Sequence, residues 1–210
     1  MKSTTITLLT LTAAASFAQS APAAASAFTT SGNLAYTSDY VWRGISQNAG
    51  DFAIQGGFDA AHSSGFSVGV WASNVSAGTS SVEVDLFANY GFKLGAFDAS
   101  LGYINYAYIG NSGLDFTEIN ASLSYSGLQF KVSKGVSNTD DYYYEANYSY
   151  DIAAIKGLNL GLHYGDDRAS AKSDFALALS YPVFGFTGTI AYSDLEDGDS
   201  ITAVTLKRSF

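Results

Sequence analysis

The C-terminal stretch ITAVTLKRSF (residues 201–210) alternates in steps of two. Counting back from Phe210, one set of side chains includes Leu206 and Val204, and the intervening set is mostly small or polar. Successive side chains on an extended backbone point to opposite faces, so this period predicts an amphipathic β-strand. What its apolar face contacts decides the fold.

The same alternation recurs along the chain after residue 28, in segments separated by short clusters of Gly, Ser, Asn and Asp, and no helical period competes with it. In residues 82–92 the even positions are apolar, whereas the odd positions carry Glu83, Asp85, Phe87 and Asn89. With the C-terminal strand, about twelve strands are expected, an even number as in single-chain outer-membrane barrels. The others are predicted at residues 33–43, 51–60, 66–73, 82–92, 97–108, 118–125, 128–134, 142–150, 158–164, 174–181 and 186–193.

The N-terminal residues 1–27 predict a secretory signal peptide. Lys2 precedes an apolar run that starts at Ile6, and small residues place the cleavage site after Ala18 or after Ala27. The apolar run is shorter than the roughly 20 residues that span a bilayer as a helix. Residues 28–210 are therefore expected to form one exported domain.

The composition is that of a β protein. The 210 residues include 15 tyrosines, 14 phenylalanines and 21 glycines, and only 14% are charged. The chain has no cysteine, but a barrel closed by backbone hydrogen bonds needs no disulfide, so a soluble periplasmic protein and a membrane barrel both remain open. A net charge of -9 argues against a nucleic-acid partner, and the absence of cofactor motifs predicts no cofactor.

Aromatic residues at the strand ends favour the membrane barrel. A soluble sandwich also alternates, but its core is usually built from Val, Ile, Leu and Phe. Rings at strand ends fit the aromatic girdle of a membrane barrel, in contact with outer-membrane lipids and lipopolysaccharide, although ordinary cross-strand packing is the alternative. The predicted girdle comprises Tyr36, Trp42, Tyr90, Phe92, Tyr125, Tyr150, Tyr164, Tyr181, Tyr192 and Phe210.

The connections between strands predict which end faces which side. The links at 62–65, 126–127 and 182–185 are tight and uncharged, whereas those at 137–141, 165–172 and 194–199 are longer and acidic. Short turns on the periplasmic side and longer loops outside are usual for such barrels.

One stretch resembles a known family. YTSDYVWRGISQN (36–48), AIQGGFDAAHSSGFSVGVWASNV (53–75) and the terminal aromatic strand are similar to the TorF-type porins, a Gram-negative outer-membrane family of uncharacterised function. The resemblance implies a small transmembrane antiparallel up-and-down β-barrel in the outer membrane, and it supplies no substrate and no catalytic residues. The terminal Phe210 also resembles the signal by which the barrel-assembly machinery recognises the last strand.

Charged side chains on the less apolar strand faces predict the lining of a pore. Two interpretations stand: an acidic lumen that favours cations, or basic side chains that pair with the carboxylates and plug the interior. About twelve strands leave a narrow passage for small solutes or ions. The candidates are Asp39, Arg43, Asp59, Glu83, Asp85, Glu118, Lys131, Glu145, His163, Asp174 and Lys207.

The segment VWRGISQN (41–48) is the strongest functional candidate. Trp42 is expected to face outward at the membrane interface, and Arg43 inward near the external mouth, with Asp39 and Asp51 as its candidate partners. Arg43 has two interpretations. It could form a constriction that selects solutes, or it could form an internal ion pair that stiffens the rim of the barrel.

Two rival functions also remain open: a closed barrel with a structural or surface-interaction role, and a lipid-modifying enzyme. His62 and His163 are the only histidines, and their neighbours do not form a nucleophile, base and carboxylate set, so no catalytic residue is predicted. The acidic segment 194–200 does not match the spacing of a calcium-binding loop, so no metal site is predicted. The oligomeric state stays open.

Overall fold

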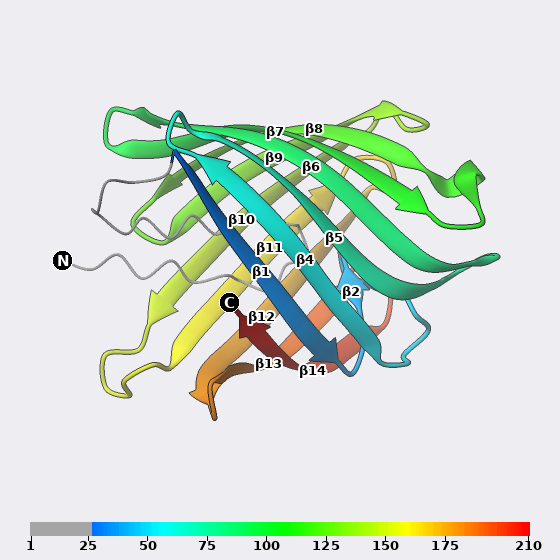
Figure 1. Ribbon diagram of the computed structural model, residues 1–210. Coiled ribbons are helices and arrows are strands. Elements are labelled where there is room, and N and C mark those ends of the chain that lie inside the picture. Colours follow the sequence, from blue (N-terminus) through cyan, green and yellow to red (C-terminus); the bar gives the residue numbers. More distant parts are fainter. Residues whose placement is uncertain (1–26) are drawn as a thin grey trace.

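The computed structural model describes residues 27–210 and contains a closed antiparallel barrel of twelve strands. Each strand pairs with its neighbours along the chain, and β14 closes the barrel against β1 (Figure 1). The predicted fold is confirmed. The strands are β1 (Phe28–Thr37), β4 (Ala53–His62), β5 (Phe66–Ala77), β6 (Ser80–Leu94), β7 (Phe97–Tyr108), β8 (Phe116–Tyr125), β9 (Leu128–Ser137), β10 (Tyr142–Asp151), β11 (Asn159–Asp167), β12 (Lys172–Val183), β13 (Phe186–Leu195) and β14 (Ser200–Ser209).

Two shorter strands and one helical turn complete the described residues. β2 (Val41–Trp42) and β3 (Ile45–Ser46) form a separate two-stranded sheet, and η1 (Ser112–Leu114) is a 3-10 turn. Within residues 27–210, no helix has the length and apolar character needed to cross a membrane. The predicted signal peptide lies outside the described residues, apart from Ala27.

The alternation along each strand separates an apolar outside from a polar inside. On β1, Leu34 is 56% exposed on the outer face while the adjacent Ala35 is 7% exposed on the inner face, and on β13 Ile190 and Thr189 differ in the same way. A soluble barrel would bury its large apolar side chains instead. The outer belt of large apolar residues is the arrangement of a barrel whose surroundings are apolar.

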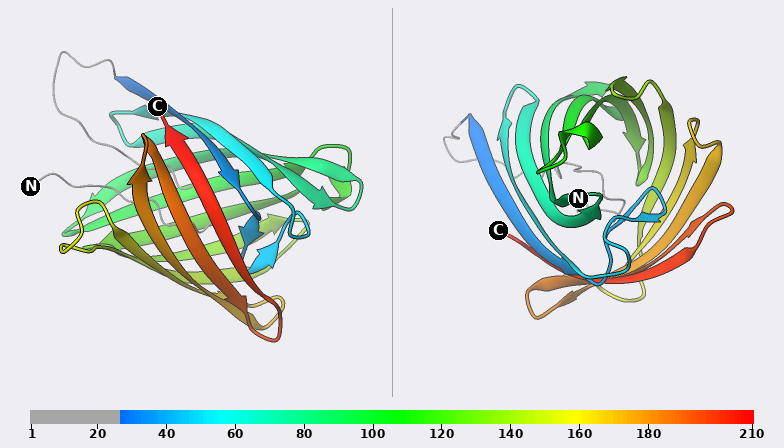
Figure 2. Two further views of the ribbon diagram at one scale, coloured as in Figure 1. Left: turned by 90° about the horizontal axis from the view of Figure 1, so that it is seen from below. Right: turned by 90° about the vertical axis from the view of Figure 1, so that its right-hand side faces the viewer.

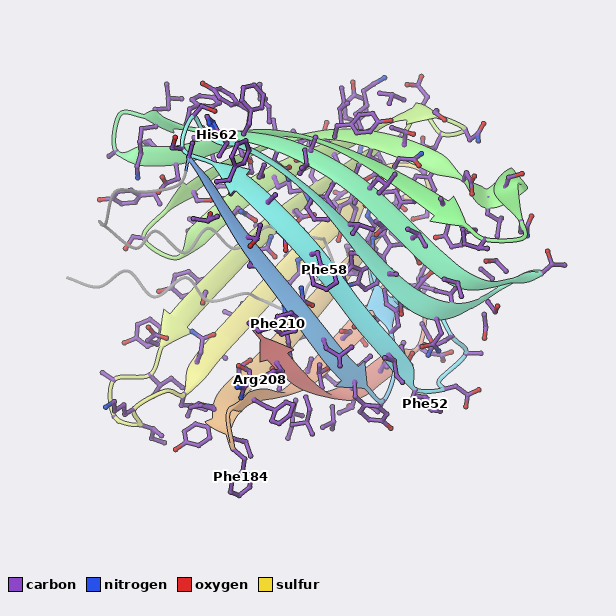
Figure 3. All side chains as sticks on the ribbon, in the orientation of Figure 1. Phe52, Phe58, His62, Phe184, Arg208 and Phe210 are labelled. Atoms are coloured by element: carbon purple, nitrogen blue, oxygen red, sulfur yellow. The ribbon has the colours of Figure 1, made fainter. Side chains whose placement is uncertain are left out.

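The seam between the first and last strands is short. β1 pairs with β4 along its whole length, but only Asn33–Thr37 pair with β14. Gly32 and Phe210 extend the seam by two backbone hydrogen bonds of 2.8 and 3.0 Å. A Cβ at Gly32 would lie 2.6 Å from the Phe210 ring, so glycine here leaves room for the ring to pack against β1, near Phe58 (Figure 3).

The connections divide between the two ends of the barrel. At the terminal end, where β1 begins and β14 ends, lie the turns at 63–65, 95–96, 126–127 and 184–185 and the longer segment 152–158. The other end, here called the loop end, carries the connections at 38–52, 78–79, 109–115, 138–141, 168–171 and 196–199. The tight uncharged links and the acidic links therefore lie at opposite ends.

The first predicted strand, 33–43, was too long. β1 ends at Thr37, and residues 38–52, here called the inner hairpin, leave the wall and fold into the barrel (Figure 2). The hairpin reverses at Arg43 and Gly44, whose φ values are 48° and 77°. Positive φ at both central residues defines a tight two-residue turn, which ends the extended run.

Candidate functional site

The inner hairpin is held together by hydrogen bonds of its own. Gln47 N donates to Tyr40 O at 2.7 Å, and Tyr40 N donates to Asn48 Oδ1 at 2.9 Å. Ser46 Oγ donates to Asp39 Oδ1 at 2.7 Å. Ser76 N of β5 donates to Gln47 O at 2.8 Å, which attaches the hairpin to the wall. The predicted pore residue Asp39 therefore belongs to the hairpin and not to a strand.

The tip of the inner hairpin contacts the inner wall at β12 and β13. A Cβ placed on Gly44 would lie 3.0 Å from Asp174 Cβ on β12 and 3.2 Å from Leu195 Cβ on β13. The hairpin starts from β1 and ends at β4, and around the barrel only β14 lies between β1 and β13, which is followed by β12. It therefore narrows the passage at the loop end.

Arg43 links the tip of the inner hairpin to β8. Its Nη2 donates to both carboxylate oxygens of Glu118 on β8, at 2.8 and 2.9 Å. The guanidinium carbon lies 4.2 Å from the Trp42 ring centre and 4.0 Å from the Tyr143 ring centre, so the cation stacks between two aromatic faces. The partner of Arg43 is thus Glu118, whereas sequence proximity suggested Asp39 or Asp51.

The expectation that Trp42 faces outward in a girdle was wrong. Trp42 packs inside the barrel against the buried cluster that contains Tyr40 and Val75, and its ring lies 6.0 Å from the rings of Tyr106 and Phe116. Because the chain turns inward after Thr37, the strand period that assigned a face to Trp42 no longer applies.

A buried hydrogen-bonded network surrounds His163 on β10–β12. His163 Nε2 lies 3.0 Å from Asp174 Oδ1, and Tyr143 Oη donates to Asp174 Oδ2 at 2.8 Å and lies 2.9 Å from His163 Nε2. On its other side, His163 Nδ1 lies 2.7 Å from Asn147 Oδ1. Of the predicted pore residues, Asp174 is thus the carboxylate that contacts His163.

The network continues to a second ion pair. Asn147 Nδ2 donates to Glu145 Oε1 at 3.0 Å, and Lys131 Nζ lies 3.5 Å from Glu145 Oε2. No serine hydroxyl contacts His163 among the residues that the structure describes, so this network has no serine nucleophile next to its histidine. Its Tyr, His and carboxylate groups orient one another and stiffen this part of the inner wall.

Glu83 and Asp85 form a contrasting acidic pair on β6. They are 2% and 3% exposed, and neither makes an ion pair with any described residue. Tyr40 Oη of the inner hairpin donates to Glu83 Oε1 at 3.3 Å. Burial, reinforced by the charges of Glu83 and Asp85, raises the pKa of the Tyr40 hydroxyl well above its usual value, so Tyr40 keeps its proton and acts as the donor.

The remaining predicted pore residues also lie on the inner faces of their strands. Asp59 on β4 is in register with Gly69 on β5, and a Cβ on Gly69 would lie 2.8 Å from Asp59 Oδ1. Lys207 on β14 is in register with the buried Ala35 of β1, which assigns it to the inner face. The two-residue alternation thus placed on the inner side all nine candidate pore residues that lie on strands, which are all the candidates except Asp39 and Arg43.

The strand-borne residues predicted for the girdle lie on the outside. Apart from Trp42, each of them is more than a third exposed, with Tyr125 at 56% and Phe210 at 67%. Tyr90, Phe92, Tyr125, Tyr150, Tyr181 and Phe210 lie near the terminal end, and Tyr36, Tyr164 and Tyr192 lie toward the loop end. Their contact with lipid remains a prediction.

Several inner aromatic residues were not predicted as site residues. Tyr143 and Tyr106 are 2% and 4% exposed, and Tyr40 is 2% exposed. Tyr143 shares its strand face with Glu145 and Asn147, so the two-residue period contained the signal for it. For Tyr40, the signal was the Arg43–Gly44 turn, which converts residues 38–52 from strand to hairpin.

Two other sequence candidates have local partners. His62 Nδ1 lies 2.7 Å from Ser64 Oγ in an exposed turn. In the acidic segment 194–200, hydrogen bonds from the side chain and backbone of Ser173 lower the pKa of the Glu196 carboxyl. Within residues 27–210, no group of three or more His, Cys, Asp or Glu side chains is arranged to hold a metal ion.

Comparison with known proteins gives a family and a fold. A family model described as "Bacterial protein of unknown function (Gcw_chp)" matches residues 21–204. The barrel is similar to the KdgM porin, with a TM-score of 0.59 and 11% identity over 86% of this chain and 98% of that chain. A structure from a study of in-meso crystallisation of membrane proteins gives a TM-score of 0.59 and 10% identity, over 86% of this chain and 83% of that chain.

A third solved structure is more distant. Pseudomonas aeruginosa OccK2, in complex with glucuronate, gives a TM-score of 0.42 and 14% identity, covering 90% of this chain and 67% of that chain. No curated protein sequence matches significantly. At these identities, the first two structural matches establish a porin-like barrel fold.

Proposed function

The chain belongs to the Gcw_chp family of bacterial proteins of unknown function, and from that premise we propose that it is a narrow outer-membrane channel for passive diffusion of small solutes or ions. One observation carries the proposal: the barrel is apolar outside and polar inside, with large exposed residues on one face of each strand and small or charged residues on the other.

The proposal includes export and membrane placement. Residues 1–27 act as a signal peptide cleaved after Ala18 or Ala27, and the exposed tyrosines and Phe210 contact lipid and lipopolysaccharide at the two membrane surfaces of a Gram-negative cell. The TorF-type resemblance of residues 36–75 is consistent with this location. The terminal end then faces the periplasm and the acidic loop end faces outward.

The charges of the interior favour cations. Arg43 and Lys131 are paired with Glu118 and Glu145, whereas Glu83 and Asp85 have no basic partner among the described residues. Uncompensated negative charge in a poorly screened passage raises the local concentration of cations. The excess of inner carboxyl groups over basic side chains is the basis of the proposed cation preference.

The inner hairpin supports a second candidate, a closed barrel. It reaches from β1 and β4 to Asp174 and Leu195 and blocks part of the loop end. The two candidates differ in a single observable, because a closed barrel conducts no current.

We expect the refolded protein, without its signal peptide, to produce discrete current steps in a planar bilayer. In a KCl gradient, the reversal potential should have the sign of cation selectivity, because the candidate pore residues include seven Asp or Glu and only three Arg or Lys. Asp98→Asn is a matched control, since Asp98 is an exposed rim residue paired with Lys93 and should leave the reversal potential unchanged. A folded barrel that stays silent would favour the closed candidate, and an anion-selective current would contradict the charge argument.

Phe210→Ala is expected to lower the amount of assembled protein in the outer membrane while leaving refolding into detergent nearly intact. Phe210 ends the closing strand and packs on Gly32, where the assembly machinery is proposed to recognise it. Phe184→Ala is the control, because this phenylalanine is also exposed, at 98% against 67% for Phe210, and lies at the tip of the 184–185 turn, away from the seam (Figure 3). Equal membrane levels of the two variants would remove the proposed role of the terminal residue.

A further inference from the structure

The amide of Asn147 determines whether His163 Nδ1 carries a hydrogen. Asn147 Nδ2 donates to Glu145 Oε1 at 3.0 Å and to Gln129 Oε1 at 3.3 Å. Turning the amide round would set its oxygen against these two acceptors, so Asn147 Oδ1 is the atom that faces His163. An amide oxygen only accepts hydrogen bonds, and it lies 2.7 Å from His163 Nδ1. This ring nitrogen is therefore a donor.

The other ring nitrogen, His163 Nε2, also faces acceptors. Asp174 Oδ1 lies 3.0 Å from it and Tyr143 Oη lies 2.9 Å from it. The single hydroxyl hydrogen of Tyr143 is donated to Asp174 Oδ2 at 2.8 Å, so the hydroxyl turns a lone pair toward His163. Without a hydrogen, Nε2 would oppose two lone pairs where the His163 and Asp174 side chains are only 5% and 4% exposed. Such an arrangement is costly, and one hydrogen on Nε2 satisfies both contacts.

We propose that His163 holds a proton on each ring nitrogen at neutral and mildly alkaline pH, and that this buried imidazolium is a positioning residue for the tip of the inner hairpin. An imidazole is a stronger base than a carboxylate, so the hydrogen between His163 and Asp174 belongs on Nε2 and Asp174 stays an anion. The Asp174 carboxylate then accepts one hydrogen bond from a cation and one from Tyr143, which stabilises its charge. The inference goes beyond the channel proposal and does not rest on it.

The proton acts on the inner hairpin through the two partners of Nε2. The Tyr143 ring stacks on the Arg43 guanidinium, whose carbon lies 4.0 Å from the ring centre. Asp174 lies against the turn, since a Cβ on Gly44 would be 3.0 Å from Asp174 Cβ. Loss of the Nε2 hydrogen leaves lone pairs opposed on both contacts, so Tyr143 and Asp174 must turn away from His163. The hairpin tip then loses part of the surface on which it packs.

The other charged groups near the cluster are already paired. The ionisable side chains that face His163 directly or through one neighbour are Tyr143 and Glu145 on β10, Asp174 on β12, Lys131 on β9, Glu118 on β8 and Arg43 of the inner hairpin. Lys131 pairs with Glu145, and Arg43 pairs with Glu118. His163 and Asp174 are therefore left as counter-ions of each other.

The direct test is ¹⁵N NMR of the refolded barrel in detergent, labelled only at histidine. The chain has two histidines, so His62→Ala leaves the signals of His163 alone. At pH 8, where an exposed imidazole is neutral, both ring nitrogens of His163 should have the chemical shift of a protonated nitrogen and a directly bound hydrogen. A neutral ring, with a hydrogen on one nitrogen only, would overturn the proposal.

Asp174→Asn tests whether the carboxylate holds the second proton. The variant keeps the size of the side chain but removes its charge, so His163 should become neutral at pH 8, with the remaining hydrogen on Nδ1 facing Asn147. Asp98→Asn, which removes an exposed carboxylate paired with Lys93 at the rim, should leave both nitrogens protonated. A second proton that survives in Asp174→Asn would contradict the assignment. If that variant does not fold, the spectrum of the parent still decides.

Fluorescence of Trp42 tests whether the proton positions the inner hairpin. Trp71→Phe leaves Trp42 as the only indole, and its emission should change over the same pH range in which NMR shows the second His163 proton leaving. The change should be absent in His163→Gln, which has no group that titrates there. If the proton stays as long as the barrel is folded, the emission should stay constant as well. A change at a different pH, or one that persists in His163→Gln, would overturn the positioning role, because a merely structural histidine gives no such curve.

Neither measurement requires the barrel to conduct. A protonated His163 in a silent barrel keeps this inference and loses the channel. A conducting barrel with a neutral His163 keeps the channel and loses this inference.

Discussion

Arg43→Ala is expected to lower the free energy of unfolding by about 3 kcal/mol and to increase the unitary conductance. The Arg43 and Glu118 side chains are 14% and 6% exposed, so removing the guanidinium leaves a buried carboxylate without its counter-ion. The same change removes the stacking between Trp42 and Tyr143 that holds the hairpin tip. Denaturant unfolding of the refolded barrel measures the first effect, and single-channel recording measures the second.

Two variants separate the role of Arg43 in stability from its role in conduction. Arg43→Lys retains the charge but loses the planar contacts, so it should fall between the parent and Arg43→Ala in both measurements. Arg43→Ala combined with Glu118→Gln should recover part of the lost stability, since no buried charge remains unpaired, yet should keep the higher conductance. If Arg43→Ala lowers stability while conductance and selectivity stay at parental values, the pair only stiffens the rim.

Gly165→Ala is expected to cost about 2 kcal/mol, because the network around His163 has no room for a methyl group. A Cβ at this position would collide with Tyr143 Oη and lie 2.5 Å from Asp174 Oδ2. Tyr143 would then lose its hydrogen bond to the Asp174 carboxylate. Chemical unfolding monitored by circular dichroism measures the loss.

The same position offers an internal control. In a Tyr143→Phe background the closest colliding atom, the hydroxyl, is absent, whereas the ring Cζ and Asp174 Oδ2 would still lie 2.5 Å from the added Cβ. Adding Gly165→Ala should therefore cost less than it does in the parent, but not nothing. Gly91→Ala on β6 is the matched glycine control, since its nearest atom would be 3.9 Å away. Equal costs for Gly165→Ala in both backgrounds would show that Tyr143 does not set the packing limit.

The strands of the barrel wall, and the face on which each side chain lies, could be predicted from the sequence because the two-residue alternation is a local property. Glu118, Glu145 and Asp174 alternate with apolar neighbours, so their inner placement follows from counting along one strand. The number of strands and the exposed aromatic residues follow from the same rule.

The interior could not be predicted in the same way. Trp42 and Arg43 continue a plausible strand locally, and only the Arg43–Gly44 pair marks a two-residue turn. The partners of the hairpin, Glu118 and Asp174, lie on distant strands, and no spacing along the chain relates them to residues 38–52. Contacts made across a barrel depend on its closure, which the alternation along one strand does not encode.

Because the inner hairpin is held by residues distant in the sequence, its docking must follow other steps of folding. Its tip meets β8, β10, β12 and β13, none of which has a binding surface for it until the wall has curved around. Loop-closure entropy opposes these distant contacts until the strands between them are paired. Docking of residues 38–52 should therefore be a late kinetic step. The last slow change in Trp42 fluorescence during refolding would then mark the time at which the barrel is complete.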